Sequence, residues 1–168
     1  MKFAVVCLLA LSLSASAQGV FGRRAPGFSL QDINYKQFYD IQDYRGKVVL
    51  LDIMKTDCPH CQELTRTLEQ VKAKYGDKIQ LLSIVNPPDS PQNIARYIKE
   101  FNLTYPILLD CGQVVASYLQ LSPQRPSLVV PHLIVIDKAG MIRRDMSEGT
   151  QGGLSLQAIT STVDPLVK

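Results

Sequence analysis

The sequence contains no tryptophan, only two histidines and only four cysteines among its 168 residues. Four cysteines are too few for the disulfide framework that holds small secreted scaffolds together. Basic and acidic side chains nearly balance, at 18 against 15, so the net charge of +3 gives no reason to expect a nucleic-acid partner. Hydrophobic residues make up 46% of the chain, which is enough to build an ordinary buried core.

An apolar stretch from Phe3 to Leu13 opens the sequence after Lys2. It falls short of the roughly 20 residues that cross a bilayer, and small residues at positions 15–17 supply a cleavage site. We therefore expect residues 1–17 to be an export signal that is removed. Residues 18–168 are then expected to form one domain in the periplasm or outside the cell, without a stable membrane anchor.

Removal of the signal leaves a closely spaced cysteine pair, Cys58 and Cys61, and a distant Cys111. Two cysteines separated by two residues can close a small disulfide ring, and the free N–H groups at a helix N-terminus favour a thiolate on the first. Cys58 is therefore the candidate nucleophile and Cys61 the resolving thiol. For Cys111 we expect a buried thiol, with a third redox cysteine or an intermolecular disulfide as the alternative.

The pattern of apolar residues predicts strands that alternate with helices. An extended hairpin within residues 23–44 precedes a buried strand at 48–53, and the cysteine pair then opens a helix over 59–75. Further strands are predicted at 79–85, 105–109, 132–137 and 141–146. One further helix is predicted to start at residues 90–91, and two others cover 113–119 and 154–163. This order predicts an α/β fold with a mixed central β-sheet flanked by helices.

Three features of this order resemble thioredoxin. The acid Asp52 stands at the end of a strand, the dithiol opens the next helix, and Pro131 opens a later strand. The segments 25–30 and 44–51 are similar to exported thioredoxins of the TlpA/ResA type, which are related to the AhpC/TSA proteins. The resemblance covers nearly all of residues 18–168. It implies a thioredoxin fold with an N-terminal β-hairpin extension, and a thiol–disulfide oxidoreductase that acts on protein substrates without a cofactor or metal. It also implies a redox-recycling partner of unknown identity.

The resemblance assigns roles around the dithiol. Asp52 stands where thioredoxins place a buried carboxylate, which could accept and return the proton of Cys61 if burial raises its pKa. Pro131 corresponds to the thioredoxin-family cis-proline, which faces the dithiol. Together with Val130 it is expected to bind an extended substrate segment.

The direction of the reaction depends on the residues beside the nucleophile. Pro59 and His60 are also the pair between the cysteines of DsbA, and a cationic imidazole near Cys58 would make the disulfide more oxidising. Val130 before the proline is another DsbA-like feature, so these details favour an oxidant or isomerase. Asp57 stands immediately before Cys58, where thioredoxins and TlpA-like proteins usually carry tryptophan. Its negative charge disfavours the thiolate form of Cys58. TlpA and ResA relatives are reductants, often in cytochrome c maturation, and that direction stays as the alternative.

Two other function classes share parts of the pattern. A copper chaperone similar to the Sco family would use Cys58, Cys61 and His132 as ligands, although Sco-like proteins separate their cysteines by three residues. A peroxidase similar to peroxiredoxins would need a threonine three residues before the reactive cysteine, whereas Thr56 lies two before it. Glu63 lies one helix position before the active-site glutamate of ResA-like proteins, so we expect a solvated first-turn acid there.

Overall fold

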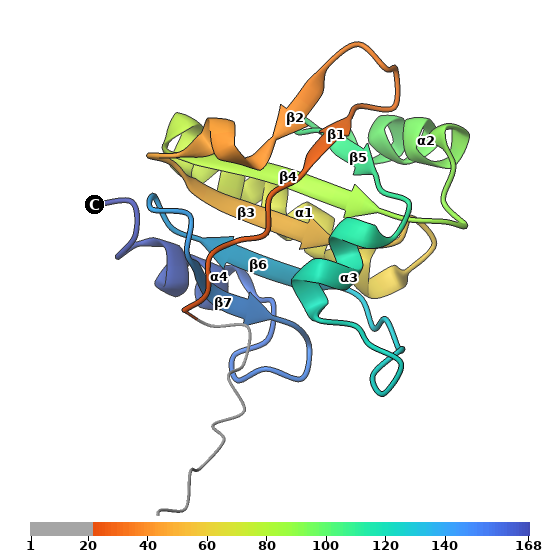
Figure 1. The fold of residues 1–168 in the computed structure, drawn as a ribbon. Coiled ribbons are helices and arrows are strands. Elements are labelled where there is room, and N and C mark those ends of the chain that lie inside the picture. Colours follow the sequence, from red (N-terminus) through yellow and green to blue (C-terminus); the bar gives the residue numbers. More distant parts are fainter. Residues whose placement is uncertain (1–21) are drawn as a thin grey trace, which may run out of the picture.

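The structure is a computed structural model, and it describes residues 22–168 (Figure 1). The expected export signal lies outside this range. A two-stranded antiparallel hairpin is formed by β1 (Ser29–Gln31) and β2 (Phe38–Asp40). It is followed by a five-stranded sheet in the order β5-β4-β3-β6-β7. These strands are β3 (Val48–Ile53), β4 (Ile79–Val85), β5 (Ile107–Leu109), β6 (His132–Ile136) and β7 (Ile142–Met146).

The sheet is mixed, because β3, β4 and β5 run parallel while β6 and β7 are antiparallel to their neighbours. The helices are α1 (Pro59–Tyr75), α2 (Pro91–Phe101), α3 (Gln113–Leu119) and α4 (Leu156–Val163). None of the helices within residues 22–168 has the length and the apolar character that crossing a membrane requires. The α/β fold with a mixed sheet and an N-terminal hairpin is confirmed.

Element ends agree with the sequence pattern where a local signal marks them. The strand at 48–53 and the helices at 59–75 and 113–119 have the predicted bounds. β5 begins two residues later than predicted, since Pro106 has no N–H to give to the ladder and offers only its carbonyl, to Ser83. α4 also begins later, because the Ser155 side chain caps it by accepting the N–H of Ala158 at 3.3 Å.

Two apolar layers cover the central strand β3, whose six residues are all buried. α1 and α4 pack on one face through a cluster that includes Leu50, Leu68 and Val163. α3 and the N-terminal segment cover the other face through Val49, Tyr118 and their neighbours. This sandwich makes β3 a rigid base for the loop that follows it.

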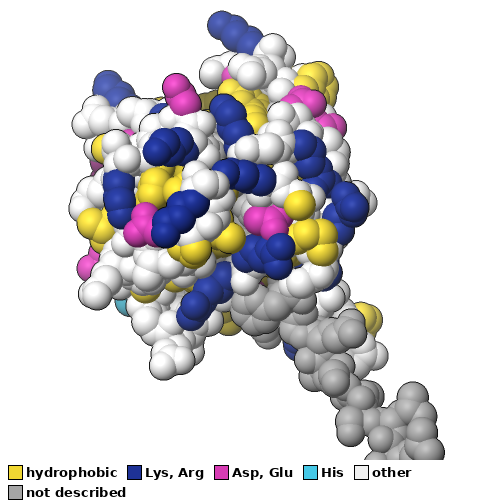
Figure 2. Space-filling view, turned by 90° about the vertical axis from the view of Figure 1, so that its left-hand side faces the viewer, with side chains coloured by type: hydrophobic (Ala, Val, Ile, Leu, Met, Phe, Trp, Pro, Cys, Tyr) yellow, Lys and Arg dark blue, Asp and Glu magenta, His cyan; other side chains and the backbone are white. Residues whose placement is uncertain are grey.

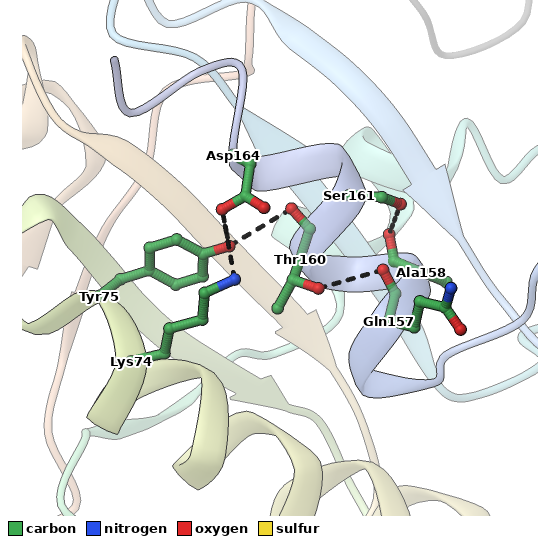
Figure 3. A network of polar contacts seen from close by, with 7 residues as sticks. All are labelled: Lys74, Tyr75, Gln157, Ala158, Thr160, Ser161 and Asp164. Atoms are coloured by element: carbon green, nitrogen blue, oxygen red, sulfur yellow. Dashed lines mark hydrogen bonds and ion pairs between the residues drawn. The ribbon is translucent and has the colours of Figure 1, made fainter.

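Polar contacts join the C-terminal end of α1 to α4 (Figure 3). The Tyr75 hydroxyl donates to an Asp164 oxygen at 2.6 Å, and the Lys74 ammonium lies 3.3 Å from the same oxygen. Exposed pairs of this kind contribute little, so the apolar cluster between the helices does most of the stabilising. α1 is therefore anchored far from its N-terminus, where the dithiol lies.

The end of the sheet opposite the dithiol faces the viewer in Figure 2. Lys and Arg side chains are spread over this surface with acidic and apolar groups among them (Figure 2). Such a mixture agrees with the near balance of charge in the sequence.

Candidate active site

Cys58 is the N-cap of α1 and is partly exposed, while Cys61 is fully buried in the first turn. Both are free thiols. The backbone N–H of Cys61 donates to the Cys58 sulfur at 3.3 Å, and Pro59 occupies the first turn, where its missing N–H costs nothing. The local sequence thus starts the helix at the dithiol and presents only one sulfur to an incoming substrate.

Val130 faces the nucleophile from the other side of the site. Its carbonyl oxygen lies 3.9 Å from the Cys58 sulfur. The peptide bond between Val130 and Pro131 is cis, as the resemblance implied. Val129, next to them in the chain, has 69% of its surface exposed, so the segment that brings the Val130 carbonyl to the reactive sulfur also carries an exposed apolar side chain.

Asp52 is buried below the dithiol, with 1% of its surface exposed. Burial raises the pKa of its carboxyl from 3.8 to about 7, and the hydrogen bond from the Ser83 hydroxyl, at 2.8 Å, acts in the opposite direction. Burial also raises the pKa of the Cys61 thiol, and the charges of Asp52 and Cys58 add to this. Cys61 therefore needs a nearby base before it can act as a nucleophile.

The His60 side chain pairs with a glutamate from another part of the chain. Its Nδ1 lies 2.6 Å from a carboxylate oxygen of Glu148, in the segment between β7 and α4. Both side chains are more than half exposed, at 59% and 54%. A groove beside this pair is lined by Glu63, Leu154 and neighbouring residues, so the imidazole is part of a polar surface next to the dithiol.

Asp89 contacts the active-site loop, which the sequence reasoning missed. The carboxylate of Asp89, in the loop after β4, accepts the backbone N–H of Thr56 at 3.2 Å and also the Thr56 hydroxyl. The Gln62 side chain donates to the Thr56 carbonyl at 3.1 Å. The parallel pairing of β3 with β4 brings these loops to the same edge of the sheet, a signal that the sequence did contain. The loop before Cys58 is thus held by a side chain 33 residues away.

Replacing Asp89 with alanine is expected to lower the free energy of unfolding by about 1–3 kcal/mol, because it leaves the Thr56 N–H without its buried acceptor. Urea unfolding measures the change. Thr56→Ser keeps both donors and is the matched control, for which we expect wild-type stability. Equal stability of Asp89→Ala and wild type would contradict a holding role for this carboxylate.

The copper ligand set is not brought together. His132 starts β6 and its Nδ1 lies 2.7 Å from a carboxylate oxygen of Asp145, in a pair that is mostly buried. Within residues 22–168, no three side chains of His, Cys, Asp or Glu lie close enough together to hold a metal ion. The structure therefore gives no support to a site made of Cys58, Cys61 and His132.

Two further expectations concern single residues. Cys111 is exposed, so the prediction of a buried thiol was wrong. The neighbouring Asp110 turns inward instead, because its carboxylate accepts the N–H of Val115 in α3 at 3.0 Å. Glu63 is exposed, as expected for a solvated acid, but it lies just beyond the first turn of α1, which holds no acidic residue.

The family model described as AhpC/TSA matches residues 21–145, which is well over half of the chain. The protein belongs to the AhpC/TSA family. It is 28% identical over 131 residues to the thioredoxin-like protein YneN of Bacillus subtilis, covering 77% of this chain and 72% of that one. It is 24% identical to the thiol-disulfide oxidoreductase ResA of Bacillus cereus, covering 97% and 96%.

Solved structures of low sequence identity share the thioredoxin fold. A thiol:disulfide interchange protein of the thioredoxin family from Chlorobium tepidum superposes with a TM-score of 0.74 at 18% identity, covering 88% of this chain and 97% of that one. The family, the fold, the oxidoreductase relatives and the close cysteine pair together make this AhpC/TSA member a TlpA/ResA-like thiol–disulfide oxidoreductase.

The peroxidase alternative is weakened by the position of Thr56 in this AhpC/TSA protein. Its hydroxyl donates to Asp89, whereas the Cys58 sulfur contacts the Val130 carbonyl and the Cys61 N–H. A peroxide-activating hydroxyl would have to contact the reactive sulfur. The geometry supports exchange between sulfurs better than reaction with peroxide.

Proposed function

We propose that this protein is exported and reduces disulfides of protein substrates through Cys58 and Cys61. The observation that carries this proposal is the arrangement of the two thiols: one reachable sulfur at a helix start, one buried sulfur behind it, and a buried acid below. Export is supported by the expected signal at residues 1–17, and a separate redox partner of unknown identity would reduce the protein again.

Reduction of a substrate proceeds in two exchanges. The Cys58 thiolate attacks one sulfur of the substrate disulfide, the substrate S–S bond breaks, and the departing sulfur takes up a proton. Cys61 then gives its proton to the Asp52 carboxylate and attacks the Cys58 sulfur. The mixed disulfide breaks, the second substrate sulfur leaves and is protonated, and the protein has given up two electrons as its dithiol becomes a disulfide.

Asp52 is suited to this proton transfer because its pKa of about 7 lies near neutral pH. A carboxyl with an ordinary pKa would bind the proton too weakly, and the raised pKa of the Cys61 thiol would keep that sulfur protonated. The shared burial of the two groups also disfavours two negative charges at once. A single proton therefore passes between them.

Substrate binding is proposed at Val130 and Pro131. The partly exposed Val130 and the exposed Val129 offer backbone and apolar surface within reach of the Cys58 sulfur. An extended substrate segment laid along them would bring its disulfide to the nucleophile. Pro131 itself is buried, so its proposed part is to shape the backbone rather than to contact the substrate through its side chain.

The pairing of His60 supports the proposed reducing direction, which the sequence analysis held as the alternative. The sequence favoured an oxidant because a cationic imidazole would stabilise the Cys58 thiolate. In the structure the Glu148 carboxylate lies against that imidazole and offsets its charge. The exposed Asp57 adds another negative charge beside Cys58. With less stabilisation of the thiolate, the disulfide becomes the weaker oxidant.

The test is the reduction potential of the Cys58–Cys61 couple, obtained by equilibrating the mature protein in glutathione buffers and trapping free thiols. We expect a value near about −270 mV, as for thioredoxin-like reductants. A value near about −120 mV would instead identify a DsbA-like oxidant and would overturn the direction proposed here.

Glu148→Gln tests whether the pairing of His60 with Glu148 lowers the reduction potential. Without the carboxylate, His60 is free to stabilise Cys58, so we expect the potential to rise by about 10–30 mV, a factor of up to about ten in the equilibrium constant. Glu63→Gln is the matched control, since Glu63 lines the same groove but is not the partner of His60. Equal shifts in the two variants would show that the pairing does not set the potential.

A further inference from the structure

The imidazole of His132 and the carboxylate of Asp145 form a pair that the mechanism above does not use. The Nδ1 atom of His132 lies 2.7 Å from an Asp145 oxygen, and the two side chains have only 20% and 16% of their surface exposed. A carboxylate can only accept a hydrogen bond, so the Nδ1–H of His132 is the donor. A charge-assisted hydrogen bond that is shielded from most of the solvent is stronger than an exposed ion pair.

The pair joins β6 to β7 at the end of the sheet where the active-site loop begins (Figure 1). The backbone of His132 pairs with Ile53, the last residue of β3 before that loop. On the other side of β6, the ladder with β7 begins only one residue later, at Leu133. Asp145 stands opposite Ile134, which shares a face of the sheet with His132, so the two paired side chains are diagonal neighbours. The side-chain pair therefore extends the attachment of β6 to β7 beyond the backbone ladder.

The segment that leads into β6 carries the backbone proposed to bind the substrate. Val130 and Pro131 come immediately before His132, and the Val130 carbonyl oxygen lies 3.9 Å from the sulfur of the nucleophile. Within the described part of the chain, residues 126–131 take part in no hydrogen bond between backbone groups. Val130 is partly buried and packs against the core. The position of the segment therefore depends on this packing and on how firmly the start of β6 is held.

We propose that His132 and Asp145 are positioning residues for substrate binding, because their pair holds the start of β6 to β7 and thereby fixes the Val130 carbonyl beside the reactive sulfur. The inference rests on the proposed binding of an extended substrate segment at Val130 and Pro131. Such a segment can donate a backbone N–H to a carbonyl that is held in place, which brings its disulfide to Cys58 in one orientation. Without the pair the carbonyl can shift, and a misplacement of about 1 Å is enough to slow a reaction about a hundredfold.

The test measures the first exchange alone, in mature protein that carries Cys61→Ser and Cys111→Ser, so that Cys58 is the only thiol that can react. The extended probe is an unstructured peptide whose single cysteine is bonded to thionitrobenzoate. The small probe is dithiobis(nitrobenzoate), which has the same leaving group and no peptide backbone. In both reactions the Cys58 thiolate attacks a probe sulfur, the S–S bond breaks and coloured thionitrobenzoate leaves. The ratio of the two rate constants separates backbone binding from the reactivity of the sulfur.

His132→Leu and Asp145→Leu are each expected to lower the rate constant with the peptide about tenfold and to leave the rate constant with the small probe unchanged. Each single variant should also lose stability in urea, because one polar partner stays mostly buried without the other. The double variant buries two apolar side chains and should regain much of that stability, yet its rate constant with the peptide should stay low. His132→Asn should restore the rate constant, since its side-chain amide can donate in place of Nδ1.

Arg143→Leu is the matched control. It breaks the ion pair of Arg143 with Asp137 at the turn end of the same hairpin, and should leave both rate constants unchanged. An unchanged rate constant with the peptide in the single variants, or an equal fall in Arg143→Leu, would overturn the proposal. So would an equal fall with both probes, which places the effect on the Cys58 sulfur, or recovery of the rate constant together with stability in the double variant. Failure of the protein with His132 and Asp145 intact to react with the peptide would instead count against the proposed function.

Discussion

Replacing Asp52 with asparagine is expected to stabilise the protein by up to about 4 kcal/mol at pH 8, less the cost of burying the amide. The carboxyl has a pKa of about 7 in the folded protein against 3.8 as its ordinary value. Between these two values the folded state binds more protons than the unfolded state, so stability is lost as the pH rises through this window. Above about pH 7 the Asp52 carboxyl is ionised in the folded protein, and burying this charge lowers the free energy of unfolding by its full amount. Asparagine has no charge to bury, so the variant avoids this loss.

Urea unfolding at pH 4 and pH 8 measures this effect. The advantage of Asp52→Asn should be large at pH 8 and small at pH 4, while its disulfide exchange becomes slow at both. Ser83→Ala in the same assay leaves the carboxyl but removes its hydrogen bond, so we expect it to lose stability at pH 8. An equal difference between Asp52→Asn and wild type at both pH values would show that the carboxyl is not the source of the effect.

Replacing Cys61 with serine is expected to trap mixed disulfides through Cys58 and to lower multiple-turnover reduction by about a hundredfold or more. The reason is that the resolving sulfur lies in the same helix turn as the nucleophile, and an intramolecular thiol has a far higher effective concentration than one in solution. Cys58→Ser should form no adduct, because Cys61 is fully buried. Non-reducing gels and mass spectrometry of the adducts measure both outcomes.

Cys111→Ser is the matched control for the trapping experiment, since its thiol is exposed and lies outside the cysteine pair. It should retain wild-type turnover, and in combination with Cys61→Ser it should leave the adduct on Cys58. Adducts that disappear in the combined variant would show that Cys111, rather than Cys58, is the sulfur that reacts.

The core of the site could be predicted because its signals are local. The spacing of Cys58 and Cys61, a proline at the helix start and a glycine at its end give α1 its observed bounds. The apolar run at 48–53 predicts a strand covered on both faces. Asp52 is therefore expected to be buried, and it is buried in the structure. In each case the signal lies within a few residues of what it determines.

Other parts of the site depend on contacts that no local pattern contains. Glu148 reaches His60 only because the segment after β7 returns to the start of α1. Asp89 reaches Thr56 because two parallel strands end at one edge. Cys111 is exposed although free cysteines are usually buried, because Asp110 takes the inward position in the turn before α3.

The sequence by itself determined the chemistry: a dithiol at a helix N-terminus above a strand that carries an acid can exchange disulfides wherever this fold forms. The tertiary structure decided how that chemistry is adjusted. The contacts of His60 with Glu148, of Asp52 with Ser83 and of Thr56 with Asp89 join residues that are distant in the chain. Charges and hydrogen bonds act through space and depend on burial, so the pKa of Asp52 follows from the packed interior and not from the residues beside it.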